Sequence, residues 1–115
     1  MRWHRETPGS YTAGAYRVEH HDHAGGFWTA SGPCVATVSH GTKADAQEAA
    51  FAAVMQRLGN PFAVDVVAGD VVAVGDRRGV VKAVFPGTHH PVYSILFSRG
   101  KRLCLDRHEF RLVAP

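Results

Sequence analysis

The sequence predicts an α+β protein in two halves: an N-terminal three-stranded antiparallel meander plus one helix, followed by a small five-stranded β-barrel. Three observations predict it. Apolar and polar residues alternate in short runs between residues 15 and 38, which is the period of half-buried strands. The alanine-rich residues 43–58 repeat their apolar positions with helical spacing. From Gly69 to Val113, short β-branched runs are separated by Gly and Pro, as in a tightly turned barrel.

The first half is expected to contain three strands after a lead-in segment. Residues 1–14 are rich in Gly, Pro, Ser and Thr, and we expect them to be only partly ordered. The glycine-containing stretches 22–26 and 31–33 can turn the chain, because glycine adopts positive φ freely. The strands that these turns separate are expected at residues 15–20, 27–30 and 34–38.

A single helix is expected over residues 43–58. The hydroxyl of Thr42 can cap its first turn. Apolar residues recur at every fourth position and form a stripe that is expected to face the sheet, with Phe51 and Met55 beside it. The stripe consists of Ala46, Ala50, Val54 and Leu58. Residues 59–61 are expected to end the helix, because they supply a capping glycine and a proline.

The second half is expected to fold into the barrel. Its strands are placed at residues 71–74, 80–85, 92–98, 102–105 and 110–113. A single helical turn over residues 106–109 precedes the last strand. These assignments divide the chain into a β-β-β-α subdomain, residues 1–60, and a barrel, residues 67–115, joined by the short apolar connection 61–66.

Charge is divided unevenly between the halves. Residues 1–66 carry five Lys and Arg against six Asp and Glu, a net charge of −1, whereas residues 67–115 carry eight against four, a net charge of +4. A positive field of this kind favours anionic partners such as nucleic acid. The alternative is a solvated surface that only keeps the protein soluble.

The chain contains no apolar run of about 18 residues, the length that spans a bilayer, and residues 1–6 lack the apolar core of a signal peptide. We therefore expect a cytoplasmic protein with no membrane partner. The two cysteines, Cys34 and Cys104, fall in different halves. We expect them to be small buried apolar residues, with a disulfide as the less favoured alternative.

The second half contains four short motifs. They are Gly-Asp-Val-Val at residues 69–72, Gly-Val-Val at 79–81, Tyr-x-Ile-x-Phe at 93–97 and a terminal element at 109–113. In these motifs the second half resembles the SH3-like barrels of the KOW and Tudor type. The resemblance implies a fold and a binding role, since members of that superfamily bind RNA, DNA, RNA polymerase or peptides.

The first half has the element order β-β-β-α, and its helix begins with Thr42-Lys43-Ala44-Asp45-Ala46. In this it loosely resembles the arm-binding N-terminal domains of phage integrases, whose sheet enters the DNA major groove. The first half is slightly acidic, which argues against a strong DNA footprint.

The sequence contains no recognisable catalytic or metal-binding motif. Three of the eight histidines cluster in His20-His21-Asp22-His23, but no Cys-x-x-Cys or His-Glu-x-x-His accompanies them. We expect exposed turn residues there, with a structural zinc site as the alternative. The serines and carboxylates are scattered and form no acid/base pair. We therefore expect no metal, no cofactor and no enzymatic activity.

Two functions are left open. The first is a non-catalytic nucleic-acid-binding module that contacts phosphates through basic loop tips of the barrel. Its predicted nucleic-acid-binding residues are Arg77, Arg78, Lys82, Arg99, Lys101, Arg102 and Arg107. The alternative is a protein-interaction or homo-oligomeric assembly module of a phage or mobile element. It is motivated by two marginally small halves and by the apolar candidates Trp3, Phe27 and Trp28.

Overall fold

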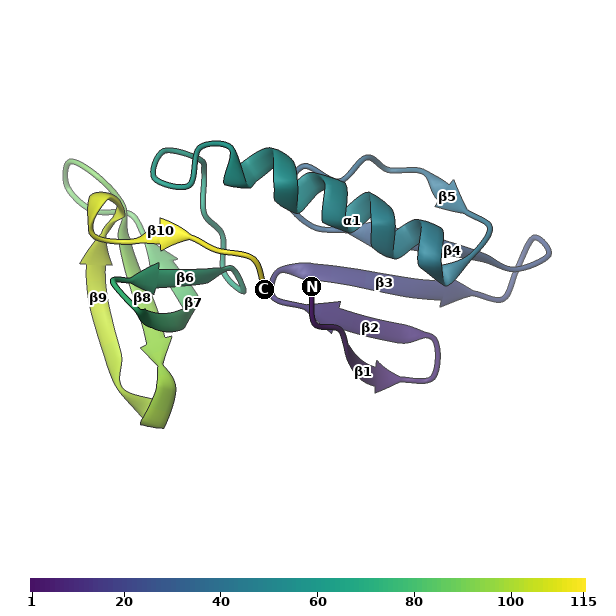
Figure 1. The fold of residues 1–115 in the computed structure, drawn as a ribbon, viewed down its shortest axis with the longest axis horizontal. Coiled ribbons are helices and arrows are strands. Elements are labelled where there is room, and N and C mark those ends of the chain that lie inside the picture. Colours follow the sequence, from purple (N-terminus) through teal and green to yellow (C-terminus); the bar gives the residue numbers. More distant parts are fainter. The chain divides into compact units, whose positions relative to one another are not determined.

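Residues 1–115 form two antiparallel sheets and one α-helix in the computed structural model (Figure 1). The α+β class predicted from the sequence is confirmed. The chain divides into two units, Met1–Gln56 and Arg57–Pro115, and each contains one five-stranded sheet. The helix, α1 (Lys43–Leu58), lies in the first unit except for its last two residues, which belong to the second.

The sheet of the first unit is a meander in which the strands follow one another in sequence order. Its strands are β1 (His4–Thr7), β2 (Ser10–Ala13), β3 (Tyr16–His21), β4 (Phe27–Ser31) and β5 (Ser39–His40). The predicted meander is present, but it has five strands and not three. β3 and β4 correspond to the first two predicted strands.

The expectation that residues 1–14 are only partly ordered is wrong, because residues 4–13 form the β1–β2 hairpin. Gly9 turns the chain with a φ of 87°. Tyr11 of β2 then pairs with Val18 of β3, so the hairpin gains an ordered neighbour. The local composition of residues 1–14 does not reveal the hairpin, since strand formation depends mainly on cross-strand partners.

The third predicted strand, residues 34–38, is also wrong. Cys34 has a φ of 65°, a left-handed conformation that does not occur within a regular strand. The strand that pairs with β4 is instead the short β5. Both Cys34 and Cys104 are free and exposed, so the expectation of buried cysteines is wrong as well. Cys104 is exposed because it alternates with Leu103 and Leu105, which pack toward the core of the second unit.

Helix α1 covers one face of the first sheet (Figure 1). The expected cap is present, since the backbone N–H of Asp45 donates to Thr42 Oγ1 at 3.1 Å. The buried apolar residues of the helix are Ala46, Ala50, Ala53 and Val54, and those of the sheet are Ala13, Tyr16, Val18 and Ala30. Phe51 and Met55, expected beside the buried stripe, are 45% and 53% exposed and point away from the core.

The sheet of the second unit has the order β10-β6-β7-β8-β9, so the last strand lies beside the first. The strands are β6 (Val71–Val74), β7 (Arg77–Phe85), β8 (Val92–Phe97), β9 (Arg102–Asp106) and β10 (Arg111–Leu112). Two single 3-10 turns, η1 (Ser98–Gly100) and η2 (Arg107–Glu109), precede β9 and β10. Five strands are thus found close to their predicted positions.

A closed barrel is not found. β9 pairs with β8 and β10 pairs with β6, and no hydrogen bonds join β9 to β10. The physical reason is the shortness of β10, whose two residues form a ladder only with β6. The sheet packs around its own core of Val66, Val72, Val81, Tyr93, Ile95, Phe97 and Phe110.

A buried ion pair lies inside the second unit. Both guanidinium nitrogens of Arg57 donate to the carboxylate of Asp70, at 2.9 and 2.6 Å. Arg57 also donates to the carbonyl of Asp65, and Asp70 accepts the backbone N–H of Val67. The aspartate of the Gly-Asp motif at the start of the sheet is therefore part of the interior of the second unit, because Asp70 is only 2% exposed.

None of the helices is long and apolar enough to cross a membrane.

Candidate nucleic-acid interface

The two hairpin turns that carry most of the predicted basic residues lie at the same end of the second sheet. β7 begins after the turn at residues 75–76, and β8 ends at η1. Gly79 near the start of β7 pairs with Phe97 at the end of β8, so both turns project from this end. We call it the basic end and define it by five exposed residues: Arg77, Arg78, Arg99, Lys101 and Arg102.

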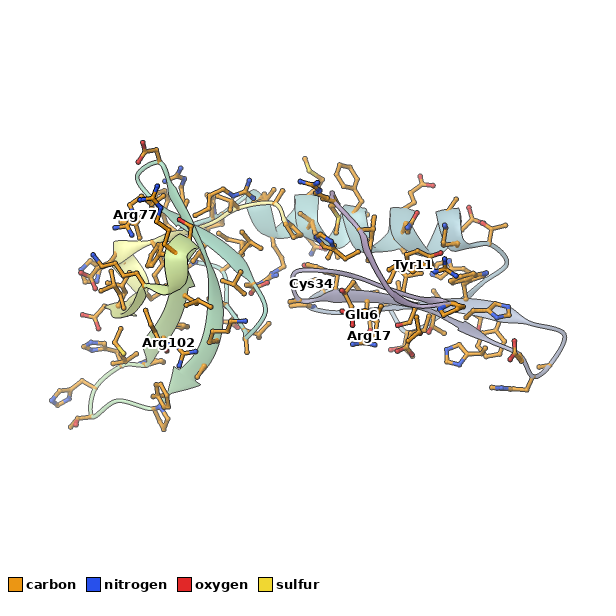
Figure 2. The ribbon with its side chains drawn as sticks, turned by 90° about the horizontal axis from the view of Figure 1, so that it is seen from below. Glu6, Tyr11, Arg17, Cys34, Arg77 and Arg102 are labelled. Atoms are coloured by element: carbon orange, nitrogen blue, oxygen red, sulfur yellow. The ribbon has the colours of Figure 1, made fainter.

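The positive charge of the basic end is barely compensated. Asp76 is the only acidic residue among residues 75–79 and 97–102, so five cations accompany one carboxylate and the local net charge is +4. None of the five cations forms an ion pair. Figure 2 shows two of them, Arg77 and Arg102, on the second unit. Uncompensated arginines of this kind are suited to phosphate oxygens.

Two of the arginines are held in place by contacts that leave their charge available. The guanidinium of Arg77 lies over the ring of Phe97, 4.9 Å from its centroid. Arg78 donates one N–H to the carbonyl of Ala114. Arg111 of β10, half-buried, donates to the carbonyl of Gly75 at 2.9 Å and adds a sixth cation beside the turn. A partly fixed guanidinium loses less side-chain entropy when it binds an anion.

An apolar hollow of about 300 Å³ lies next to the basic end. Val71, Val80 and Leu96 line it from three neighbouring strands, because Val80 pairs in register with both of the others. They alternate with the core residues of the same strands and therefore belong to the opposite, outer face. Arg78 and Ser98 also line it. The hollow thus combines aliphatic walls with a guanidinium.

The backbone of the β8–β9 turn is strained at a charged residue. Arg99 adopts a left-handed conformation with a φ of 66°. This conformation costs an L-residue about 1–2 kcal/mol, and glycine would avoid that cost. Strain retained at an exposed position is a pointer to function. Here it presents a cation at the tip of the turn.

Two of the predicted residues lie outside the basic end. Lys82 is exposed in the middle of β7, at the bulge in its pairing with β8. Arg107 lies in η2 and donates to the main-chain carbonyls of Pro61, Val64 and Phe110 at 2.9–3.2 Å. Burial lowers the pKa of the Arg107 guanidinium, which nevertheless stays protonated at neutral pH. Its contacts join segments of the second unit.

The histidine-rich turn is engaged in local contacts. His21 stacks on Phe27 with ring centroids 4.8 Å apart, and His20 Nδ1 lies 3.1 Å from a carboxylate oxygen of Asp22. His40 Nε2 is buried without a hydrogen-bond partner. No group of three or more His, Cys, Asp or Glu side chains is arranged to hold a metal ion.

Sequence reasoning missed two parts of this surface. Arg111 was assigned to the closing strand and not to a site, yet its pairing with Ala73 brings it to the 75–76 turn. The hollow was missed although a signal existed, since β6, β7 and β8 have apolar residues at consecutive positions. Such runs place apolar side chains on both faces of a strand.

Comparison with known proteins found no family model, no curated protein and no solved structure that matches the chain. Function is therefore inferred from the chemistry of the basic end and of the apolar hollow.

Proposed function

We propose that the second unit is a non-catalytic nucleic-acid-binding module. The observation that carries the proposal is the convergence of Arg77, Arg78, Arg99, Lys101 and Arg102 at one end of the sheet, with Asp76 as the only acidic residue in the two segments that carry them. Nucleic-acid phosphates are the abundant polyanions that such a cluster would contact.

We also propose that the second unit is an SH3-like barrel of the KOW or Tudor type that is left open along one seam. Five short antiparallel strands, with the last beside the first, support this assignment. The proposal places the ligand at the hairpin ends of the sheet, where a rigid scaffold presents its loops.

The basic end and the hollow would act on different parts of the ligand. The guanidinium and ammonium groups of the turns would contact phosphates, which gives affinity without reading sequence. Val71, Val80 and Leu96 would contact a sugar or base beside Arg78. Lys82 would extend the contact along β7, whereas Arg107 would act on the interior of the unit.

Salt dependence tests the proposal. Binding of the full chain to a labelled single strand of about 20 nucleotides is measured by fluorescence anisotropy at rising KCl. Up to five phosphate contacts predict that log Kd rises with log salt with a slope of about 3–4. Absence of binding at low salt, or a Kd that does not change with salt, would contradict the proposal.

A pair of charge reversals places the site. The double variant Arg99→Glu/Lys101→Glu is expected to weaken binding more than about tenfold and to lower the salt slope by about 1.4. The matched control Arg2→Glu/Arg17→Glu changes the net charge equally in the first unit, and its Kd is expected to stay within about twofold. Equal losses in both variants would show that net charge alone drives binding.

A second candidate function is self-association through α1. Phe51 and Met55 lie one turn apart on its exposed side, and Val38 is 53% exposed in the same unit. Paired exposed apolar residues of this kind occur at protein interfaces. Sedimentation equilibrium tests it: a dimer that dissociates in Phe51→Glu/Met55→Lys would support this function, and a monomer at all concentrations would reject it.

A further inference from the structure

The first unit holds a separate cleft of about 510 Å³ that the proposed function does not use. It opens beside the turn between β1 and β2. Small-molecule sites commonly have volumes of about 300–1,000 Å³. The residues that line this cleft are Arg5, Pro8, Gly9, Tyr11, His20, Asp22 and Trp28.

The aromatic side chains of the cleft lie on the helix-facing side of the first sheet. Tyr11 pairs with Val18, and Trp28 pairs with His20, which is two residues beyond Val18 on the same face. Figure 2 shows Tyr11 on the side of the helix and Arg17 on the opposite side of the sheet. The cleft therefore lies on the part of this face next to the residues that pack beneath α1.

The rings are tilted against one another and are not stacked in parallel. The centroids of His20 and Trp28 are 5.0 Å apart with an interplanar angle of 53°, and those of Tyr11 and Trp28 are 6.3 Å apart at 42°. Trp28 lines the cleft, so a planar ligand ring that enters the cleft can stack on the indole. Stacking of a base on an aromatic side chain is favourable for every base.

Charges of both signs border the rings. Arg5 pairs with Tyr11 in the sheet and has no acidic partner. The ammonium of Lys43 lies 4.5 Å from the centroid of the Tyr11 ring. The Asp22 side chain is 98% exposed and is 3.1 Å from His20 Nδ1. The cleft thus offers cations for an anionic group and a carboxylate for hydroxyl or amino donors.

We propose that this cleft binds a nucleotide. The base stacks on Trp28 beside His20, the phosphate is bound by Arg5 with Lys43 adding positive charge, and Asp22 accepts from a ribose hydroxyl or an amino group of the base. A nucleotide carries all three features, whereas a simple aromatic compound or inorganic phosphate carries one. Two sources share this chemistry: a free mononucleotide and an unpaired nucleotide within a strand.

Fluorescence of Trp28 tests the proposal. In the variant Trp3→Phe, Trp28 is the only tryptophan of the full chain. Adenosine 5′-monophosphate is expected to quench it saturably, and adenosine and ribose 5-phosphate are each expected to bind at least about tenfold more weakly. Absence of a saturable change up to about 10 mM adenosine 5′-monophosphate, or equal binding of ribose 5-phosphate, would overturn the proposal.

Variants on the two faces of the sheet localise the site by calorimetry. Arg5→Ala and Trp28→Leu are expected to weaken adenosine 5′-monophosphate about tenfold. Arg17→Ala and Phe27→Leu are matched controls, because Arg17 and Phe27 point to the opposite face, and each is expected to change Kd less than about twofold. Asp22→Asn, at a fully exposed position, keeps the test decisive if Trp28→Leu does not fold. Losses in the controls equal to those in the cleft variants would overturn the assignment.

A final comparison identifies the source of the nucleotide. A six-nucleotide adenine strand is titrated into the Trp3→Phe chain that also carries Arg99→Glu/Lys101→Glu, so that the basic end does not contribute. Stronger quenching of Trp28 by the strand than by adenosine 5′-monophosphate identifies an unpaired nucleotide of nucleic acid as the ligand. The reverse order identifies a free mononucleotide. Because Trp28 lies in the first unit, failure here is distinguishable from failure of the basic end to bind.

Discussion

The two units contain sheets with the same number of strands, but they bury different residues. The first sheet is covered by a helix whose buried side is mostly alanine, such as Ala46 and Ala50, and these small side chains let the helix lie close to the strands. The second sheet has no helix of its own above it and curls around large β-branched and aromatic residues such as Ile95 and Phe110.

Because a helix covers the first sheet and no helix of its own covers the second, the two units leave different surfaces accessible to ligands. In the first unit the helix occupies part of one sheet face, and the aromatic cleft with Tyr11 and Trp28 lies on the remainder of that face. In the second unit the whole outer face is free of a covering helix, and it carries the apolar hollow beside cationic turns. The net charges of the two units, −1 for residues 1–56 and +4 for residues 57–115, follow the same division.

The comparison can be tested because each unit has its own probe. Both tryptophans lie in the first unit, so their fluorescence during urea unfolding reports on that unit. Hydrogen exchange of the Val81 and Ile95 amides in β7 and β8 reports on the second unit. The four substitutions below are ordered from the largest expected effect to the smallest.

Asp70→Ala is expected to lower the free energy of unfolding of the second unit by about 3–5 kcal/mol, because it leaves the buried guanidinium of Arg57 without its carboxylate. Exchange of the Val81 amide measures this loss. The control Glu19→Ala removes the exposed pair with Arg17 in the first unit, and by tryptophan fluorescence it is expected to cost less than about 1 kcal/mol. A similar small loss for Asp70→Ala would show that the ion pair does not hold the second unit together.

Gly79→Ala is expected to destabilise the second unit by about 1–3 kcal/mol, because the added Cβ would meet Ile95 Cγ2 at 2.7 Å and the Leu96 carbonyl oxygen at 3.0 Å. Exchange of the Ile95 amide measures the effect. Gly41→Ala in the first unit, followed by tryptophan fluorescence, is the control, since nothing lies within 4 Å of its Cβ position. If Gly79→Ala is as well tolerated as Gly41→Ala, close packing of β7 on β8 is not a requirement.

Thr42→Ala is expected to lower the free energy of unfolding of the first unit by about 1 kcal/mol, because the N-terminus of α1 loses its capping hydroxyl. Urea unfolding followed by tryptophan fluorescence measures this change. Thr37→Ala, at an exposed loop position, is the control and is expected to have little effect. An unchanged midpoint in Thr42→Ala would mean that the helix covering the first sheet does not depend on its cap.

Arg99→Gly is expected to stabilise the second unit by about 0.5–1 kcal/mol while lowering the salt slope of nucleic-acid binding by about 0.7–1. Glycine relieves the left-handed backbone, and the lost cation removes one phosphate contact. Lys101→Gly is the matched control: Lys101 has an ordinary φ of −73°, so glycine there is expected to destabilise by about 0.5–1 kcal/mol and to lower the slope equally. If Arg99→Gly stabilises the second unit but leaves the salt slope of nucleic-acid binding unchanged, Arg99 makes no phosphate contact.

Several features of the fold could be predicted from local sequence. The strands of the second unit follow from β-branched runs bounded by Gly and Pro, and α1 follows from its alanine spacing and from Thr42. These signals are reliable because they act within a few residues of the chain. The basic residues could likewise be identified as candidates, since charge does not depend on the fold.

Other features depended on partners distant in the sequence. The β1–β2 hairpin is ordered by pairing with β3, and the residues of β1 lack the alternation of apolar and polar residues that marks a half-buried strand. Phe51 and Met55 lie on the exposed side of α1 because the sheet accommodates alanine beneath the helix, which periodicity alone does not distinguish. Arg107 resembles a surface arginine in the sequence, yet its guanidinium contacts three carbonyls of the second unit.

By itself the sequence determined where the strands of the second unit lie, where the helix begins and ends, and which half is positive, because propensity, capping and charge are local properties. Only the tertiary structure decided that the second sheet stays open and that two hairpins bring five cations to one end. It also decided that Tyr11, His20 and Trp28 border one cleft. The reason is that strand register, which sets the neighbours of each side chain, depends on pairing between segments far apart in the chain.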